Sequence, residues 1–115
     1  MIRRIYYYKN YYLNFYKTLD SKVQKKFNWT LQLIATLDKA IPKKYFQHIT
    51  NSSGLYEIRV EVESDIYRVF CFFDKGNIVI LINGFRKKTQ KTPVKELEMA
   101  ERLKKQYFEE QNCSS

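Results

Sequence analysis

Apolar and charged side chains alternate along Leu55-Tyr56-Glu57-Ile58-Arg59-Val60-Glu61-Val62-Glu63. A period of two residues is typical of a β-strand with one buried face and one polar face. Two further strand-like segments follow, at residues 66–74 and 77–84. The turns between them are Ser64-Asp65 and Lys75-Gly76, and the glycine can adopt the positive φ that tight hairpins need. We therefore expect a meander of three antiparallel strands.

Turns of two residues would fix the register of this meander. They pair Val62 with Tyr67, Val60 with Val69 and Ile58 with Cys71 in the first hairpin. In the second hairpin they pair Phe73 with Ile78, Cys71 with Ile80 and Val69 with Ile82. One face of the sheet is then continuously apolar and must be covered by helices. The other face mixes arginines with aromatic and polar side chains, namely Arg59, Glu61, Arg68, Phe70, Phe72, Val79, Leu81, Asn83 and Phe85.

Helical periodicity precedes the sheet. Residues 3–8 are rich in Ile and Tyr and favour a short strand, whereas the apolar spacing in residues 11–18 predicts a short helix. Asp20 and Ser21 are good N-cap residues for a second helix, whose apolar positions recur every three or four residues until Pro42 ends it. These two helices would form a hairpin that covers the apolar face.

A polar loop and a last helix complete the pattern. Residues 43–54 are polar and end in a turn signal, so we expect a loop there. Thr92 as N-cap and Pro93 as first helical residue open a helix that runs to about residue 111. Its inner stripe would consist of Val94, Leu97, Ala100 (or Glu101) and Leu103. Phe70 and Phe72 could stack on nucleobases or pack beneath this helix, and we favour packing beneath it.

The order strand, helix, helix, three strands, helix predicts a small α+β domain with an antiparallel sheet packed on a helical hairpin. The chain has 115 residues, enough for one hydrophobic core, so we expect a single domain over residues 1–111 and a frayed tail at 112–115. A hydrophobic content of 44% is too high for a disordered chain.

Cysteine and histidine usage predicts an intracellular protein without a structural metal. Cys71 and Cys113 have no paired spacing, and His48 is the one histidine. The basic N-terminus lacks the apolar stretch of a signal peptide, and no window reaches the length of about 20 apolar residues that spans a membrane. We expect a cytoplasmic location, no membrane contact, no metal and no small-molecule cofactor.

Positive charge dominates the chain, with a formal net charge of +9, and gathers after the last strand. Between residues 85 and 105, eight Lys or Arg side chains stand against three glutamates. Such a run suits a nucleic-acid backbone, because neutralised phosphates release counterions. The alternative is a solvated face that keeps the protein soluble. Arg59, Arg68 and the aromatic side chains predicted on the same sheet face favour nucleic-acid binding.

A catalytic site for conventional metabolism is not visible in the sequence. There is no Gly-rich phosphate loop, nucleophile elbow or cluster of metal ligands. RNA cleavage by attack of the 2′-hydroxyl needs a base, an acid and a group that stabilises charge. His48 stays a candidate for RNA contact on that ground, although a lone histidine in a polar loop is more often a plain surface residue. Glu57 and Glu61 flank Arg59 and are expected to hold its guanidinium.

Three segments resemble the HigB-like branch of the RelE/ParE toxin superfamily. They are Gly54-Leu55-Tyr56-Glu57-Ile58-Arg59, Tyr67-Arg68-Val69-Phe70-Cys71-Phe72-Phe73 and Leu81-Ile82-Asn83-Gly84-Phe85-Arg86-Lys87-Lys88-Thr89-Gln90-Lys91-Thr92-Pro93. The last segment is the most specific. The resemblance implies a RelE-like fold and a toxin of a type II toxin–antitoxin module that cuts mRNA on the ribosome. It also implies a cognate antitoxin, in this branch usually a helix-turn-helix protein.

The resemblance assigns roles to named residues as expectations. Arg59 and Arg68 would hold the scissile phosphate, and Lys87 or Lys88, with a pKa lowered by neighbouring cations, would transfer protons. The residues expected to contact RNA are Arg86, Gln90, Lys91, Lys95 and His48. Many relatives have a histidine at the position of Asn83, so the identity of the general acid or base stays open.

Two other functions fit the same fold. ParE-like relatives poison DNA gyrase instead of cutting RNA. A non-catalytic nucleic-acid-binding protein, or a decayed phage-derived module, is the third reading, and Asn83 makes it more credible. Fold alone does not separate these functions.

Overall fold

The computed structural model describes residues 2–88 and 93–113. The strands are β1 (Arg4–Tyr7), β2 (Phe46–His48), β3 (Leu55–Val62), β4 (Asp65–Asp74) and β5 (Ile78–Lys87). The helices are α1 (Tyr11–Lys17), α2 (Ser21–Thr36) and α3 (Val94–Cys113). The α3 helix continues two residues beyond the predicted end near residue 111.

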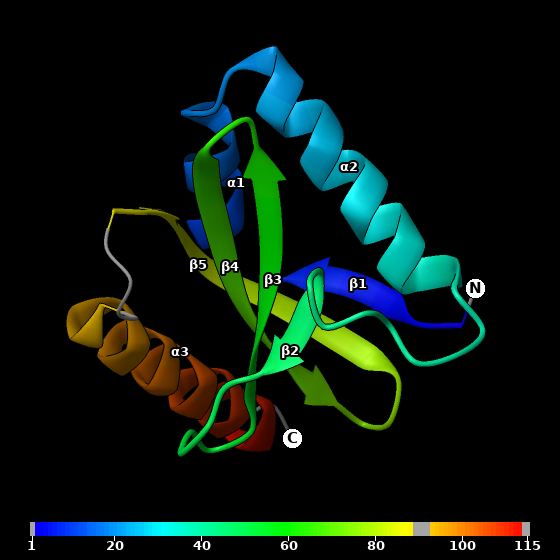
Figure 1. The fold of residues 1–115 in the computed structure, drawn as a ribbon. Coiled ribbons are helices and arrows are strands. Elements are labelled where there is room, and N and C mark those ends of the chain that lie inside the picture. The colour runs from blue at the N-terminus through cyan, green and yellow to red at the C-terminus, as the bar shows by residue number, and fades with distance from the viewer. Residues whose placement is uncertain (1, 89–92, 114–115) are drawn as a thin grey trace.

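One five-stranded sheet in the order β1-β5-β4-β3-β2 organises the molecule. The α1–α2 hairpin covers one face and α3 covers the other (Figure 1). This confirms the predicted α+β fold and the antiparallel meander of β3, β4 and β5. The sheet as a whole is mixed, because β1 pairs with β5 in parallel.

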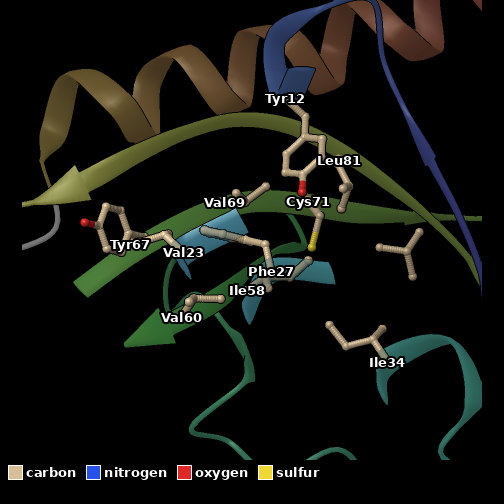
Figure 2. Packing of buried hydrophobic residues seen from close by; sticks show 11 residues of the cluster. Tyr12, Val23, Phe27, Ile34, Ile58, Val60, Tyr67, Val69, Cys71 and Leu81 are labelled. Atoms are coloured by element: carbon tan, nitrogen blue, oxygen red, sulfur yellow. The ribbon is translucent and has the colours of Figure 1, made fainter. Parts of the chain in front are cut away.

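The hairpin face forms the larger apolar core. Phe27 and Ile34 of α2 are fully buried against Ile58, Val69 and Cys71 of the sheet. Figure 2 shows side chains from α1, α2 and the strands converging in this cluster. The predicted cap is confirmed, since the Asp20 carboxylate accepts a hydrogen bond from the Val23 amide at 3.1 Å.

The α2 helix ends at Thr36 and not at Pro42 as predicted. The reason is tertiary. The Arg3 guanidinium donates to the carbonyls of Ile34 and Leu37 at 3.0 Å each, and the Ala35 carbonyl accepts from the amides of Ile2 and Arg3. These bonds satisfy the last carbonyls of the helix, so no further turn is needed.

A short strand replaces part of the predicted loop at residues 43–54. The β2 strand pairs with β3, and Phe46 stacks on Tyr56 with ring centroids 5.0 Å apart. His48 therefore lies in a strand and not in a loop, with its ring edge-to-face against Tyr56. A strand of three residues is too short for its alternation to be visible in the sequence.

The register of the first hairpin differs from the prediction by two residues. Val62 pairs with Asp65 and Val60 with Tyr67, because the turn is Glu63-Ser64, with Glu63 at φ 58°. A shift by two residues leaves every side chain on its predicted face.

The second hairpin is shifted by one residue, which exchanges faces. Phe73 pairs with Val79 and Cys71 with Leu81, so Val79 and Leu81 belong to the hairpin core. The isoleucines Ile78, Ile80 and Ile82 pack under α3 instead. The prediction placed these two sets on the opposite faces.

An irregularity between Val69 and Cys71 changes the register again, so Val69 pairs with Gly84. Asn83 and Phe85 consequently face α3, as predicted. A Cβ on Gly84 would lie 2.5 Å from the Phe15 ring. Glycine here lets α1 pack closely on β5.

The α3 face is a second apolar core. Phe70 and Phe72 are fully buried beneath Ala100 and Leu103, which confirms their predicted place. Val94 was predicted in the inner stripe but is 67% exposed. The first turn of α3 meets the sheet through the polar contact of Glu96 with Asn83, and Val94 points elsewhere.

Candidate functional site

Two arginines lie side by side on the face of the sheet that packs against α3. Arg59 of β3 and Arg68 of β4 are direct cross-strand partners, and Arg68 is opposite Phe85 of β5. Lys87 is two residues after Phe85 on β5, and side chains two residues apart on a strand share a face. Lys87 therefore lies on the same face as Arg68, diagonally across from it. The structure thus brings together three of the four predicted catalytic residues.

Like charges directly opposite each other in a sheet are destabilising unless acids compensate them. Each arginine has its own carboxylate partner. Arg68 Nε lies 3.0 Å from Glu57 Oε2, and Arg59 lies 3.5 Å from Glu61 Oε1. We predicted that both glutamates hold Arg59. The prediction is confirmed for Glu61 but wrong for Glu57, which pairs with Arg68 on the neighbouring strand.

The two ion pairs differ in solvation. The side chains of Arg68 and Glu57 are 8% and 11% exposed, whereas those of Arg59 and Glu61 are 36% and 57% exposed. The Arg68–Glu57 contact is close but lacks the alignment of a hydrogen bond. Arg68 is therefore an internal residue held by a buried carboxylate, and Arg59 is the more accessible cation.

Lys87 has a lowered pKa. Partial burial is the largest cause, and the positive charges of Arg68 and Arg59 add to it, against an opposing effect of Glu57. A neutral amine is therefore easier to reach at Lys87 than at an ordinary surface lysine. Lys88 follows the strand and is exposed.

The other residues predicted to contact RNA lie apart from the cluster formed by Arg59, Arg68 and Lys87. Arg86 alternates to the hairpin face, where it pairs with Asp65 at 2.5 Å. His48 also points to the hairpin face, at the outer strand β2. Lys95 is exposed in the first turn of α3. Gln90 and Lys91 lie outside the described residues.

Asn83, where many relatives have a histidine, is buried at 4% exposure. Its Nδ2 donates to both the backbone carbonyl and the side chain of Glu96 at 3.1 Å, while its Oδ1 finds no donor among the described residues. Asn83 thus connects β5 to the start of α3 and does not face solvent beside Arg59.

A cleft that no sequence pattern predicts borders the cluster at Arg59. It has a volume of about 430 Å³ and is lined by Lys26, Lys44, Tyr45, Arg59, Glu61 and Glu63. Arg59 belongs to both the cleft and the cluster. No local sequence pattern indicates this cleft, because its residues come from α2, from the segment before β2 and from β3.

Within residues 2–88 and 93–113, no group of three or more His, Cys, Asp or Glu side chains is arranged to hold a metal ion. Over the same residues, no helix has the length and apolar character needed to cross a membrane.

The family model named Phage derived protein Gp49-like matches residues 14–105, which is most of the chain. The chain belongs to this family. A comparison with curated proteins finds no match. Among solved structures, the chain is similar to one from the archaeal RelE–RelB complex of Pyrococcus horikoshii OT3. The TM-score is 0.53 at 14% identity, over 73% of this chain and 93% of the archaeal one.

The family model shows the Gp49-like family, and the structural likeness confirms the RelE-like fold expected from the sequence motifs. The cluster of Arg59, Arg68 and Lys87 therefore lies on a RelE-like scaffold.

Proposed function

We propose that this Gp49-like protein is the toxin of a type II toxin–antitoxin module and that it cleaves mRNA on the ribosome. The observation that carries the proposal is the row formed by Arg59 and Arg68 with Lys87 beside it. Arg59 and Lys87 are partly exposed and the buried Arg68 lies next to both, so their combined positive charge suits a phosphodiester whose charge grows in the transition state. The motifs that resemble HigB-like toxins include all three residues.

In the proposed reaction the 2′-hydroxyl attacks the adjacent phosphorus. A bond forms between the 2′-oxygen and phosphorus while the bond to the 5′-oxygen breaks, giving a cyclic phosphate and a free 5′-hydroxyl. A base takes the proton from the 2′-hydroxyl, and an acid donates one to the leaving oxygen. Arg59 would contact the phosphate oxygens, and the buried Arg68 would add its positive charge next to it. Lys87 is the described residue best suited to proton transfer because of its lowered pKa.

Regulation by a partner protein belongs to the same proposal. The archaeal neighbour is described as part of a RelE–RelB complex. By analogy, an antitoxin would bind this chain and hold it inactive, and the sequence motifs imply a helix-turn-helix protein. Coexpression of a small helix-turn-helix protein encoded next to this chain should relieve growth arrest and copurify with it.

The test is inducible expression in a bacterial host with mapping of mRNA 5′ ends. The wild type should arrest growth and produce cuts phased with codons in translated regions. The variants Arg59→Ala and Lys87→Ala should lose the cuts, while Lys105→Ala, an exposed cation of α3, should behave as wild type. Both site variants avoid the buried Arg68, whose loss would also affect folding.

Three outcomes would contradict the proposal. Cuts that persist in both site variants would separate cleavage from this cluster. Growth arrest with DNA damage and intact mRNA would indicate gyrase as the target. No arrest by the folded wild-type protein would indicate a binding protein or a decayed module.

A further inference from the structure

The cleft beside Arg59 exists because β2 is short. β2 pairs with β3 only at Tyr56, Glu57 and Ile58, and the last contact is the Arg59 amide donating to the Tyr45 carbonyl at 2.9 Å. Beyond this point, no strand among the described residues pairs with the outer edge of β3. Helix α2 contributes Lys26 as the opposite wall.

An aromatic pair, the exposed Trp29 and the partly buried Tyr45, lies at this cleft. Trp29, one helical turn after Lys26, is 51% exposed, and its ring lies 5.4 Å from that of Tyr45, which lines the cleft. Lys44 Nζ is 4.9 Å from the centre of the Tyr45 ring. A large aromatic side chain half in water offers a face on which a nucleobase can stack.

The charges of the cleft favour an anion. Lys26, Lys44 and Arg59 line it together with Glu61 and Glu63. Glu63 is already paired with Lys22 at 2.8 Å, and Glu61 holds Arg59 only at 3.5 Å. The lining therefore carries three positive charges against two negative ones, and the pairing of Glu63 with Lys22 increases this excess of positive charge.

We propose that this cleft binds one nucleotide of single-stranded RNA next to the scissile phosphate. The base stacks on Tyr45 and meets Trp29 edge-on, since the two rings are inclined at 70° to each other, and the phosphate contacts Lys26 and Lys44. Arg59 connects the two sites, because it lines the cleft and is also the cross-strand partner of Arg68. This inference rests on the proposed RNA-cleaving function and adds a substrate subsite to it.

Trp29 makes the subsite measurable, because it is the one tryptophan of the chain. A short single-stranded RNA with 2′-O-methyl groups, which cannot be cleaved by 2′-attack, serves as the probe. Binding should quench the Trp29 emission. Tyr45→Leu, which keeps apolar volume but removes the aromatic face, should weaken binding about 10-fold. Lys44→Glu, at an exposed position, should weaken it most at low salt.

The control is Tyr6→Leu, which alters an aromatic residue that is 51% exposed, like Trp29, at a separate groove between β1 and α2. It should bind the RNA as wild type does. Cleavage of mRNA in a translation extract is measured for the same proteins, and Tyr45→Leu and Lys44→Glu should slow it by factors similar to their loss of binding.

The outcomes separate the two proposals. If the wild type cleaves mRNA but Trp29 emission does not respond, or if Tyr45→Leu and Lys44→Glu cleave as wild type, the subsite is overturned and the proposed function stands. If the wild type neither binds the RNA nor cleaves mRNA, both are overturned.

Discussion

Arg68→Met should destabilise the fold far more than Arg59→Met, although the two arginines are direct neighbours. Arg68 and Glu57 are 8% and 11% exposed with their charged atoms 3.0 Å apart, so the substitution leaves a buried carboxylate without its cation. Breaking such a pair from one side costs roughly 3–5 kcal/mol. Arg59 is 36% exposed and its carboxylate is 3.5 Å away, so its loss should cost less than about 1 kcal/mol.

The assay is urea unfolding followed by circular dichroism, with the midpoint and slope fitted for each variant. For a domain of this size, Arg68→Met should lower the melting temperature by roughly 10 °C or more. The double variant Glu57→Gln/Arg68→Met should recover part of the lost stability, because it buries neither charge alone.

A different result would refute the reasoning about burial. If Arg68→Met lost less than about 1 kcal/mol, like Arg59→Met, the Glu57 carboxylate would have to be solvated after the change. If the double variant were as unstable as the sum of both single ones, the two side chains would not interact. Because an Arg68 variant is expected to be less stable, its folded fraction has to be measured before a loss of toxicity is assigned to the site.

Two further predictions concern Lys87 and Gly84. Arg59→Gln removes a positive neighbour, so the pKa of Lys87 should rise, which NMR titration of its side chain would detect; an unchanged pKa would mean that the charge of Arg59 does not contribute to the lowering. Gly84→Ala should destabilise the fold by about 1–3 kcal/mol through the clash with Phe15, and Phe15→Leu should partly restore stability in the double variant; an additive loss in urea unfolding would show that the clash is not the cause.

Local patterns predicted most elements of this fold. The alternation in residues 55–63, the cap at Asp20 and the helical spacing that follows it depend on near neighbours in the chain, so they can be read without tertiary contacts. The two-residue shift in the first hairpin left the predicted faces correct, because side chains two residues apart on a strand point to the same side. The one-residue shift in the second hairpin exchanged the sheet faces of Val79 and Leu81 with those of Ile78, Ile80 and Ile82. The sequence does not distinguish the two arrangements, because both sets are apolar and either could face a core.

The candidate site divides in the same way. The motifs singled out Arg59, Arg68 and Lys87, and alternation put the two arginines on one face. Neither could show that Glu57 pairs with Arg68, that Arg86 and His48 point to the other face, or that Asn83 is buried against α3. Those facts depend on which strands become neighbours.

The basic charge, the α+β order of elements and the residues that carry the family motifs follow from the amino-acid sequence, because each depends on composition or on short-range periodicity. The solvation of the two arginines, the parallel pairing of β1 and the cleft beside Arg59 follow from the three-dimensional fold. The physical reason is that burial and cross-strand proximity arise from packing between segments far apart in the chain, where Gly84 against Phe15 and the short β2 set the geometry.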